Sequence, residues 1–150
     1  MSKKTIAFLF LLFLLPIILY LIWPSDESRI RKLIREGAAA IEREDVGAVM
    51  SKVSYNYSDE YGFTYLYIKK SLERVFLQMS DISVEYENPK VTVRDKTAIA
   101  DMDVSVIATK GSDTGYIMGD PANPVHIKFS LEKERTKWLV TKTEGLPVYW

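Results

Sequence analysis

A tyrosine-rich turn followed by an amphipathic helix is the clearest pattern of hydrophobic and polar positions in the chain. The stretch Ser54–Met79 contains the turn, which breaks at Gly62, and the helix, which is apparent from Leu66. The apolar positions of the helix are Leu66, Ile68, Leu72, Val75, Phe76 and Met79. From Leu72 onward they are spaced by three and four residues, which predicts a helix with one buried face.

Two further helices are predicted before the turn. Apolar residues recur with helical spacing over Ser28–Glu44, and Ser25 or Ser28 is expected to cap that helix. A shorter helix is predicted over Val46–Val53, with Asp45 as its cap.

The period of the pattern changes to two after Asp81, which predicts strands. The predicted strands are Ile82–Glu87, Lys90–Arg94, Thr97–Thr109, Val125–Glu134 and Trp138–Glu144. Pro89 interrupts the first two and predicts a bent or edge strand there. The segment Lys110–Pro124, rich in Gly, Asp and Pro, is predicted to be a loop.

Helices followed by antiparallel strands predict an α+β fold, with three helices packed on a sheet of about four or five strands. The chain has 150 residues, which suits one domain. We predict an N-terminal end at residues 1–4, a transmembrane anchor at 5–23, a linker at 24–27, the domain at 28–144 and an apolar tail at 145–150.

The anchor prediction rests on Thr5–Trp23, a run without any charged residue. As a helix it would be about 28 Å long, close to the thickness of a bilayer's hydrocarbon core. A cleaved signal peptide is the alternative. The run is long for a signal core, and its end, Leu21–Ser25, lacks a small-x-small cleavage site, so we favour an uncleaved anchor.

The charges beside the anchor give two opposing indications of its orientation. Lys3 and Lys4 favour a cytoplasmic N-terminus, whereas the basic residues after the anchor favour the reverse. Those later residues belong to a predicted helix of the domain, and long domains are translocated largely regardless of charge. We therefore expect a single-pass protein of the cytoplasmic membrane, with its domain on the extracytoplasmic side.

Composition excludes several kinds of function. The chain has 20 basic and 20 acidic residues, so without Lys3 and Lys4 the domain is slightly acidic and does not suggest a nucleic-acid-binding surface. It has no cysteine, which excludes disulfides, thiolate metal sites and cysteine nucleophiles. It has one histidine, so a metal site built from several histidines is excluded too, and no cofactor is predicted.

The order of the predicted elements resembles the nuclear transport factor 2-like group, the cone-shaped fold shared with ketosteroid isomerase and SnoaL-like cyclases. The residues that carry the resemblance are Glu44-Asp45-Val46-x-x-Val49, Ser54-x-x-Tyr57-Ser58-Asp59-x-x-Gly62, Ile82-x-Val84, Val91-x-Val93-x-Asp95-x-x-Ala98 and Lys137-Trp138-Leu139-Val140. The chain is similar to small bacterial membrane-anchored members of this group. The resemblance implies a pocket between the concave face of the sheet and the helices, and it leaves the function open, because this fold hosts both enzymes and binding modules.

An enzyme of this kind needs an acid or histidine that points into the pocket. Asp101 and Asp103 share one face of their predicted strand, opposite the apolar face, and His126 lies on the polar face of its own strand. All three are therefore expected to point outward.

The candidate ligand-binding residues lie in and around the tyrosine-rich turn: Tyr55, Tyr57, Asp59, Tyr61 and Tyr65. Their rings and hydroxyls could hold a small apolar ligand. The structural alternative is that the rings fill the wide end of the cone and that Asp59 is a turn residue ahead of Gly62. No catalytic residue is assigned.

These observations predict a non-catalytic binding or adaptor module of the cell envelope, anchored in the bilayer through Thr5–Trp23. Its expected partner is a protein or a small apolar ligand, and two copies could pair through the outer face of the sheet, where Ile99 and Ile107 lie. The alternative is a small isomerase- or cyclase-like enzyme that uses Asp59 and a nearby tyrosine. The tail Gly145–Trp150 is expected either to fold back onto the sheet or to contact a partner.

Overall fold

The computed structural model describes residues 3–147 of the chain. Its helices are α1 (Lys3–Ile22), α2 (Asp26–Glu42), α3 (Val46–Met50) and α4 (Tyr65–Gln78). Its strands are β1 (Ser80–Tyr86), β2 (Lys90–Arg94), β3 (Thr97–Lys110), β4 (Asp113–Met118), β5 (Val125–Glu134) and β6 (Lys137–Glu144). The α+β class is confirmed, and the sheet is fully antiparallel.

Strand β3 is the central element of the sheet. Along one edge it pairs with β2 and then β1, and along the other with β5 and then β4. Strand β6 pairs with β5. The segment that contains Pro89 separates β1 from β2, and both are edge strands, as predicted from that proline.

The prediction of a loop over Lys110–Pro124 is wrong in part, because this segment contains β4. Its residues Thr114–Ile117 have no alternation of apolar and polar side chains, and all of them are exposed, so no period of two marks the strand. Backbone hydrogen bonds to the second half of β3 hold it, for example in the pair Thr109 and Thr114.

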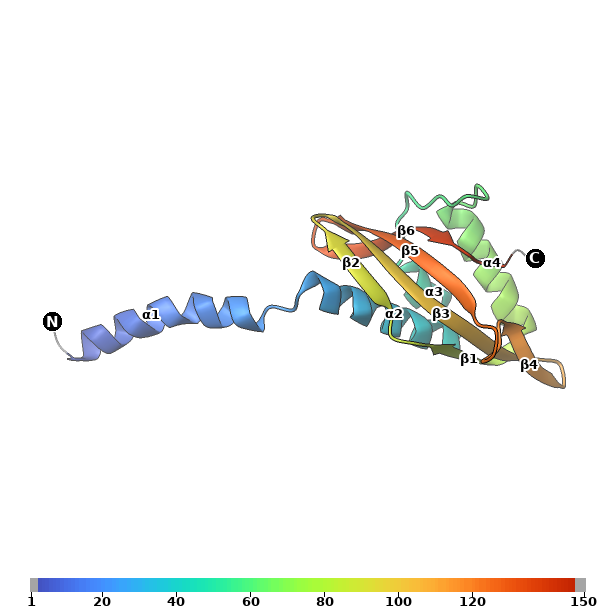
Figure 1. Ribbon diagram of the computed structural model, residues 1–150, viewed down its shortest axis with the longest axis horizontal. Coiled ribbons are helices and arrows are strands. Elements are labelled where there is room, and N and C mark those ends of the chain that lie inside the picture. Colours follow the sequence, from blue (N-terminus) through green and yellow to red (C-terminus); the bar gives the residue numbers. More distant parts are fainter. Residues whose placement is uncertain (1–2, 148–150) are drawn as a thin grey trace.

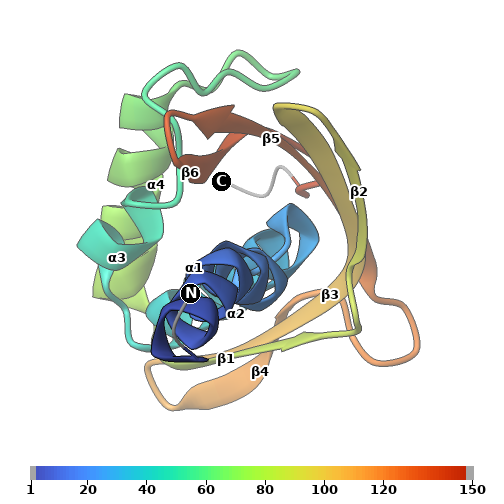
Figure 2. The ribbon, with the colours of Figure 1, turned by 90° about the vertical axis from the view of Figure 1, so that its left-hand side faces the viewer.

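The helices lie on the concave face of the sheet. Figure 2 shows the sheet curving around α2, with α3 and α4 on the opposite side. The predicted caps are present: the Ser25 hydroxyl accepts the backbone N–H of Ser28, and Asp45 accepts that of Ala48. In Figure 1, α1 extends away from the domain on the side where α2 begins.

The core is tightest at the end of the cone nearest α1. Ile30 and Ala100 are fully buried there, and Leu131 and Trp138 are nearly so. The inward face of β3 consists of Ala98, Ala100, Met102, Val104, Val106 and Ala108, all buried, as the alternation in the sequence predicts. Leu146 also packs against this core, so the predicted tail folds back at least as far as this residue. Residues 148–150 of the tail lie outside the described residues.

Candidate functional site

Helix α4 differs from the other helices of the domain in how it packs. Its apolar face was predicted to be buried, but none of its residues, all of which the structure describes, is buried. Leu72, Val75 and Phe76 instead face a cavity between α4, α2 and the concave side of the sheet. The prediction of a buried face is confirmed in part: the periodicity identified the inward face, and Ile68 and Phe76 pack against the core, but the face is only half-buried because the cavity lies beneath it.

This cavity has a volume of about 310 Å³, the size of a small-molecule site. Its lining is almost entirely apolar and comes from α2, α3 and α4, from the tyrosine-rich turn and from the inner face of the sheet. Representative lining residues are Leu33 and Ala38 of α2, Ile68 and Leu72 of α4, Val84 of β1, Met102 and Val104 of β3, Met118 of β4, Phe129 of β5 and Val140 of β6.

A small polar group borders the cavity at the tyrosine-rich turn. One carboxylate oxygen of Asp59 accepts the backbone N–H groups of Tyr61 and Phe63, each at 2.9 Å. The other accepts the hydroxyl of Tyr57 at 3.3 Å. Asp59 is only 8% exposed, so it both holds the turn together and lines the cavity.

Burial controls the chemistry of Tyr57. Its side chain is buried, and this burial raises the pKa of the phenol to about 12, although a hydrogen bond with Thr143 of β6 acts in the opposite direction. The Tyr57 hydroxyl therefore stays protonated at neutral pH. It is a hydrogen-bond donor placed between Asp59 and Thr143 beside an apolar cavity.

Three aromatic rings form a stack along the same border. Phe63 lies against Tyr67 with ring centroids 4.1 Å apart, and Tyr61 lies 5.7 Å from Phe63. All three line the cavity. Tyr61 and Tyr67 are also substantially exposed, so this aromatic stack connects the apolar interior with solvent.

The structure separates the five candidate ligand-binding residues into two groups. Tyr57, Asp59 and Tyr61 line the cavity. Tyr55 and Tyr65 do not: their rings pair with each other at 4.6 Å, and Tyr55 is 83% exposed. Sequence reasoning did not select Phe63 and Thr143 as site residues.

The outer face of the sheet carries the other predicted acids. Asp101 and Asp103 lie on either side of His126, with nitrogen–oxygen distances of 3.4 and 3.0 Å. Hydrogen bonds to Asp103 and Asp101 raise the pKa of His126 above its ordinary value. All three point away from the cavity, as predicted, and pairing of two copies through this face stays a prediction.

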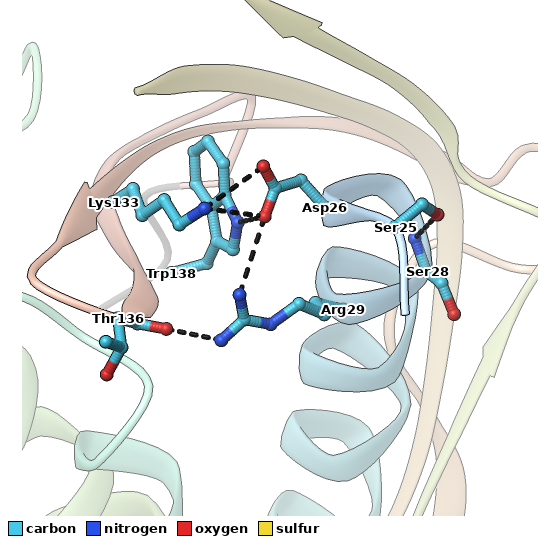
Figure 3. A network of polar contacts seen from close by, with 7 residues as sticks. All are labelled: Ser25, Asp26, Ser28, Arg29, Lys133, Thr136 and Trp138. Carbon is cyan, nitrogen blue, oxygen red and sulfur yellow. Dashed lines mark hydrogen bonds and ion pairs between the residues drawn. The ribbon is translucent and has the colours of Figure 1, made fainter. Parts of the chain in front are cut away.

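A polar network joins the start of α2 to the hairpin of β5 and β6 (Figure 3). Asp26 accepts hydrogen bonds from the indole Nε1 of Trp138 at 3.0 Å and from Lys133 at 2.9 and 3.1 Å. Arg29 contacts Asp26 at 3.6 Å and donates to the backbone oxygen of Thr136. This network lies at the narrow end of the cone, the end nearest α1 (Figure 1). The cavity lies farther along α2, because the residues of α2 that line it begin at Leu33.

Helix α1 is long and apolar enough to cross a membrane over Thr5–Ile22, and none of that span is buried within the structure. Length and composition do not distinguish an anchor from a signal sequence, and the sidedness of the domain stays a prediction.

Comparison with solved structures shows the nuclear transport factor 2-like, or cystatin-like, cone fold. A candidate aromatic ring hydroxylase from Novosphingobium aromaticivorans is 19% identical, with a TM-score of 0.67 over 79% of this chain and 85% of that one. An NTF2-like protein with a cystatin-like fold from the same organism is 16% identical, with a TM-score of 0.61 over 79% of each chain.

A third similar structure, a candidate scytalone dehydratase from Novosphingobium aromaticivorans, is 13% identical, with a TM-score of 0.68 over 79% of this chain and 80% of that one. No protein-family model matches the sequence, and no curated protein matches it. The chain is thus an α+β cone of the nuclear transport factor 2-like fold, preceded by one helix that could span a membrane.

Proposed function

We propose that the protein is a membrane-anchored binding module whose cone cavity holds a small, apolar, uncharged ligand. The observation that carries this proposal is the inner face of α4, which has no fully buried residue and places Leu72 and Val75 over a cavity of about 310 Å³. An apolar helix face left over open space costs stability unless something else covers it, and a ligand would supply that cover.

Gly37 supports the proposal independently. It lies in the interior of α2 and lines the cavity, and a Cβ built there would meet no described atom within 4 Å. Packing therefore does not require glycine, although glycine in a helix interior costs roughly 1 kcal/mol relative to alanine. Keeping the wall free of a side chain at this point is consistent with a site shaped for a ligand.

The charges of the lining favour a neutral ligand. The described lining residues include one cation and one carboxylate, Lys52 and Asp59. Lys52 pairs with Glu36 at 2.8 Å, and Asp59 is occupied by the turn and Tyr57. A ligand carboxylate or ammonium would find no free partner, whereas a ligand hydroxyl could donate to the hydroxyl oxygen of Tyr57 or Thr143.

Binding of 1-aminoanthracene, a neutral apolar fluorophore, to the full-length protein in lipid nanodiscs tests the proposal against empty nanodiscs. We expect saturable binding by the wild type. Leu72→Trp fills the cavity and should weaken binding at least tenfold, whereas Leu77→Trp, on the outward side of the same helix at an 87% exposed position, should not.

Two results would contradict the proposal: no saturable binding by the wild type, or equal binding by both tryptophan variants. Circular dichroism checks that Leu72→Trp is folded, and Ala38→Leu, which fills the cavity from α2, serves as a second filling variant.

The enzyme alternative requires a pocket carboxylate that is free to move a proton, and Asp59 is held by three hydrogen bonds. Asp59→Asn separates the two functions. It keeps an oxygen that accepts the two backbone N–H groups, so a binding module should retain the fluorophore, whereas an enzyme should lose turnover while staying folded.

The proposed location is the cytoplasmic membrane, with α1 as an uncleaved anchor and the domain on the extracytoplasmic side. Because the chain has no cysteine, Ser112→Cys introduces a single thiol in the exposed β3–β4 turn. A membrane-impermeant maleimide should label it in intact cells, and labelling only after lysis would place the domain on the cytoplasmic side.

A further inference from the structure

The domain begins very close to the end of the candidate membrane span. Helix α1 ends at Ile22 and α2 begins at Asp26, with three residues between them. Three residues reach at most about 10 Å. If α1 spans a bilayer, the first turn of α2 therefore lies at the level of the lipid headgroups or just beyond them.

Two hairpin tips are tied to this first turn. The network around Asp26 and Arg29 holds the tip between β5 and β6, through Lys133, Trp138 and Thr136. The backbone N–H of Lys133 donates in turn to the oxygen of Lys96 at 2.8 Å, which holds the tip between β2 and β3 beside it. Figure 1 shows both tips at the end of the domain nearest α1.

The two tips carry four basic residues, Arg94, Lys96, Arg135 and Lys137, which we call the hairpin-tip surface. All four are exposed, and no ion pair involves their side chains in the part of the chain that the structure describes. The acids nearest to them in sequence are Asp95, Glu132 and Glu134, and Glu134 already accepts the hydroxyl of Ser54. By contrast, Lys133 and Arg29, whose side chains are half-buried beside these tips, are both paired with Asp26.

Arg135 is also in a backbone conformation that does not suit it. Its φ is +57°, in the left-handed region where glycine or asparagine is favoured. Asp95, at the tip between β2 and β3, has a φ of +54°, so this conformation belongs to the two tight turns and not to the positive charge.

We propose that the hairpin-tip surface binds anionic lipid headgroups of the leaflet next to the domain. The inference rests on the proposed anchoring of α1. Exposed lysines and arginines are attracted to an anionic bilayer within about 10 Å of its surface, and the anchor already holds the tips in that zone. Together, the anchor and the surface would fix the narrow end of the cone against the membrane and leave the cavity on the side away from it.

A single-thiol experiment on the full-length chain tests this inference, because the chain has no cysteine of its own. Thr136→Cys places a fluorescent label at the β5–β6 tip, and Ser112→Cys places one in the β3–β4 turn, which Figure 1 shows at the opposite end of the domain. The protein is reconstituted into vesicles of phosphatidylcholine with or without phosphatidylglycerol, each containing a lipid with a quenching headgroup.

We expect the label at position 136 to be quenched in the anionic vesicles and the label at 112 not to be. Quenching at 136 should fall in neutral vesicles and at high salt, since the attraction is electrostatic. It should also fall when the four residues of the hairpin-tip surface are changed to glutamine. The control variant has glutamine at four basic positions elsewhere on the domain, Lys69, Arg74, Lys90 and Lys110. It loses the same amount of positive charge, and the quenching at position 136 should be unchanged.

Equal quenching at 136 with and without phosphatidylglycerol, or quenching that survives the four glutamines, would overturn the inference. Arg135→Asn provides a second variant that suits the left-handed backbone, so a decrease in quenching there cannot come from unfolding. Flotation of the protein with the vesicles is measured in parallel. Protein that fails to float would overturn the anchor as well as this inference, whereas floating protein without quenching at 136 would overturn this inference alone.

Discussion

The carboxylate of Asp26 accepts a hydrogen bond from the indole Nε1–H of Trp138 at 3.0 Å, although the two residues are separated by almost the whole domain in sequence. Asp26 is the first residue of α2, and Trp138 is a buried residue of β6. The bond therefore connects the segment that follows the candidate anchor to the last strand of the sheet.

Asp26→Ala should destabilise the domain by about 1–3 kcal/mol, because it leaves the Trp138 N–H and the Lys133 ammonium without their acceptor. Urea unfolding followed by tryptophan fluorescence measures the loss. Glu27→Ala is the matched control, since among the described residues Glu27 pairs only with Arg31 on the exposed side of α2, and it should cost less than about 0.5 kcal/mol.

The same network predicts an acid dependence of stability. The hydrogen bonds from Trp138 and Lys133 lower the pKa of Asp26 below its ordinary value near 3.9. The stability that Asp26 contributes is therefore present above that value and is lost as pH falls through the lower folded-state pKa. Asp26→Asn should remove this part of the acid dependence. An unchanged acid profile in the variant would show that other carboxylates dominate it.

Tyr57 should titrate apart from the other tyrosines. Burial raises its pKa to about 12, so the folded protein should retain one protonated phenol at a pH where exposed tyrosines have ionised. Because the unfolded-state pKa is near 10, the contribution of Tyr57 to stability is present below pH 10 and is lost as pH rises toward 12. Ultraviolet difference titration of Tyr57→Phe should lack this late step, and a wild type without the step would contradict the buried position of the phenol.

Two glycines should respond to alanine in opposite directions. Gly37→Ala adds a methyl group in open space within a helix and should stabilise the domain by about 0.5–1 kcal/mol, with no loss of fold. Gly145 has a φ of +87°, and a Cβ there would lie 2.1 Å from the backbone oxygen of His126, so Gly145→Ala should cost about 3 kcal/mol or more. Thermal unfolding of both variants checks the pair, and a destabilised Gly37→Ala would show that α2 is packed more tightly there than described.

His126 should titrate above its ordinary pKa of about 6.5, because Asp103 and Asp101 stabilise its charged form. Its imidazole signal in proton NMR should show this, and Asp103→Asn should move the midpoint down. The cluster is exposed on the outer face, so neither change should alter binding in the cavity.

The period-two pattern of the strands was sufficient to predict the inward face of β3 and the outward direction of Asp101, Asp103 and His126. These predictions hold because register on a sheet with one buried face is fixed by the side-chain alternation. Strand β4 was missed because its residues Asp113–Ile117 are exposed and carry no alternating hydrophobic pattern.

The site was less predictable than the fold, for reasons visible at particular residues. The pairing of β5 with β6 shifts register between Ser130 and Leu131, which oppose Lys142 and Val140. This irregularity breaks the alternation of buried positions in β6: Trp138 and Val140 are buried, but the next buried residue is Thr143. A strict period of two in the sequence therefore does not predict that the Thr143 hydroxyl lies beside Tyr57. The spacing of apolar residues in α4 gave the correct face, but a pattern of side chains along one helix cannot indicate how far that helix stands from the sheet.

Native mass spectrometry shows directly whether the cavity beneath α4 holds a small apolar ligand. The full-length protein is extracted gently from the membranes of its own host and measured beside Leu72→Trp. If the proposed function holds, the wild type carries a small neutral adduct that the filled variant lacks. A wild type without any small adduct, carrying a second polypeptide instead, would contradict it and direct attention to the outer face of the sheet as an adaptor surface.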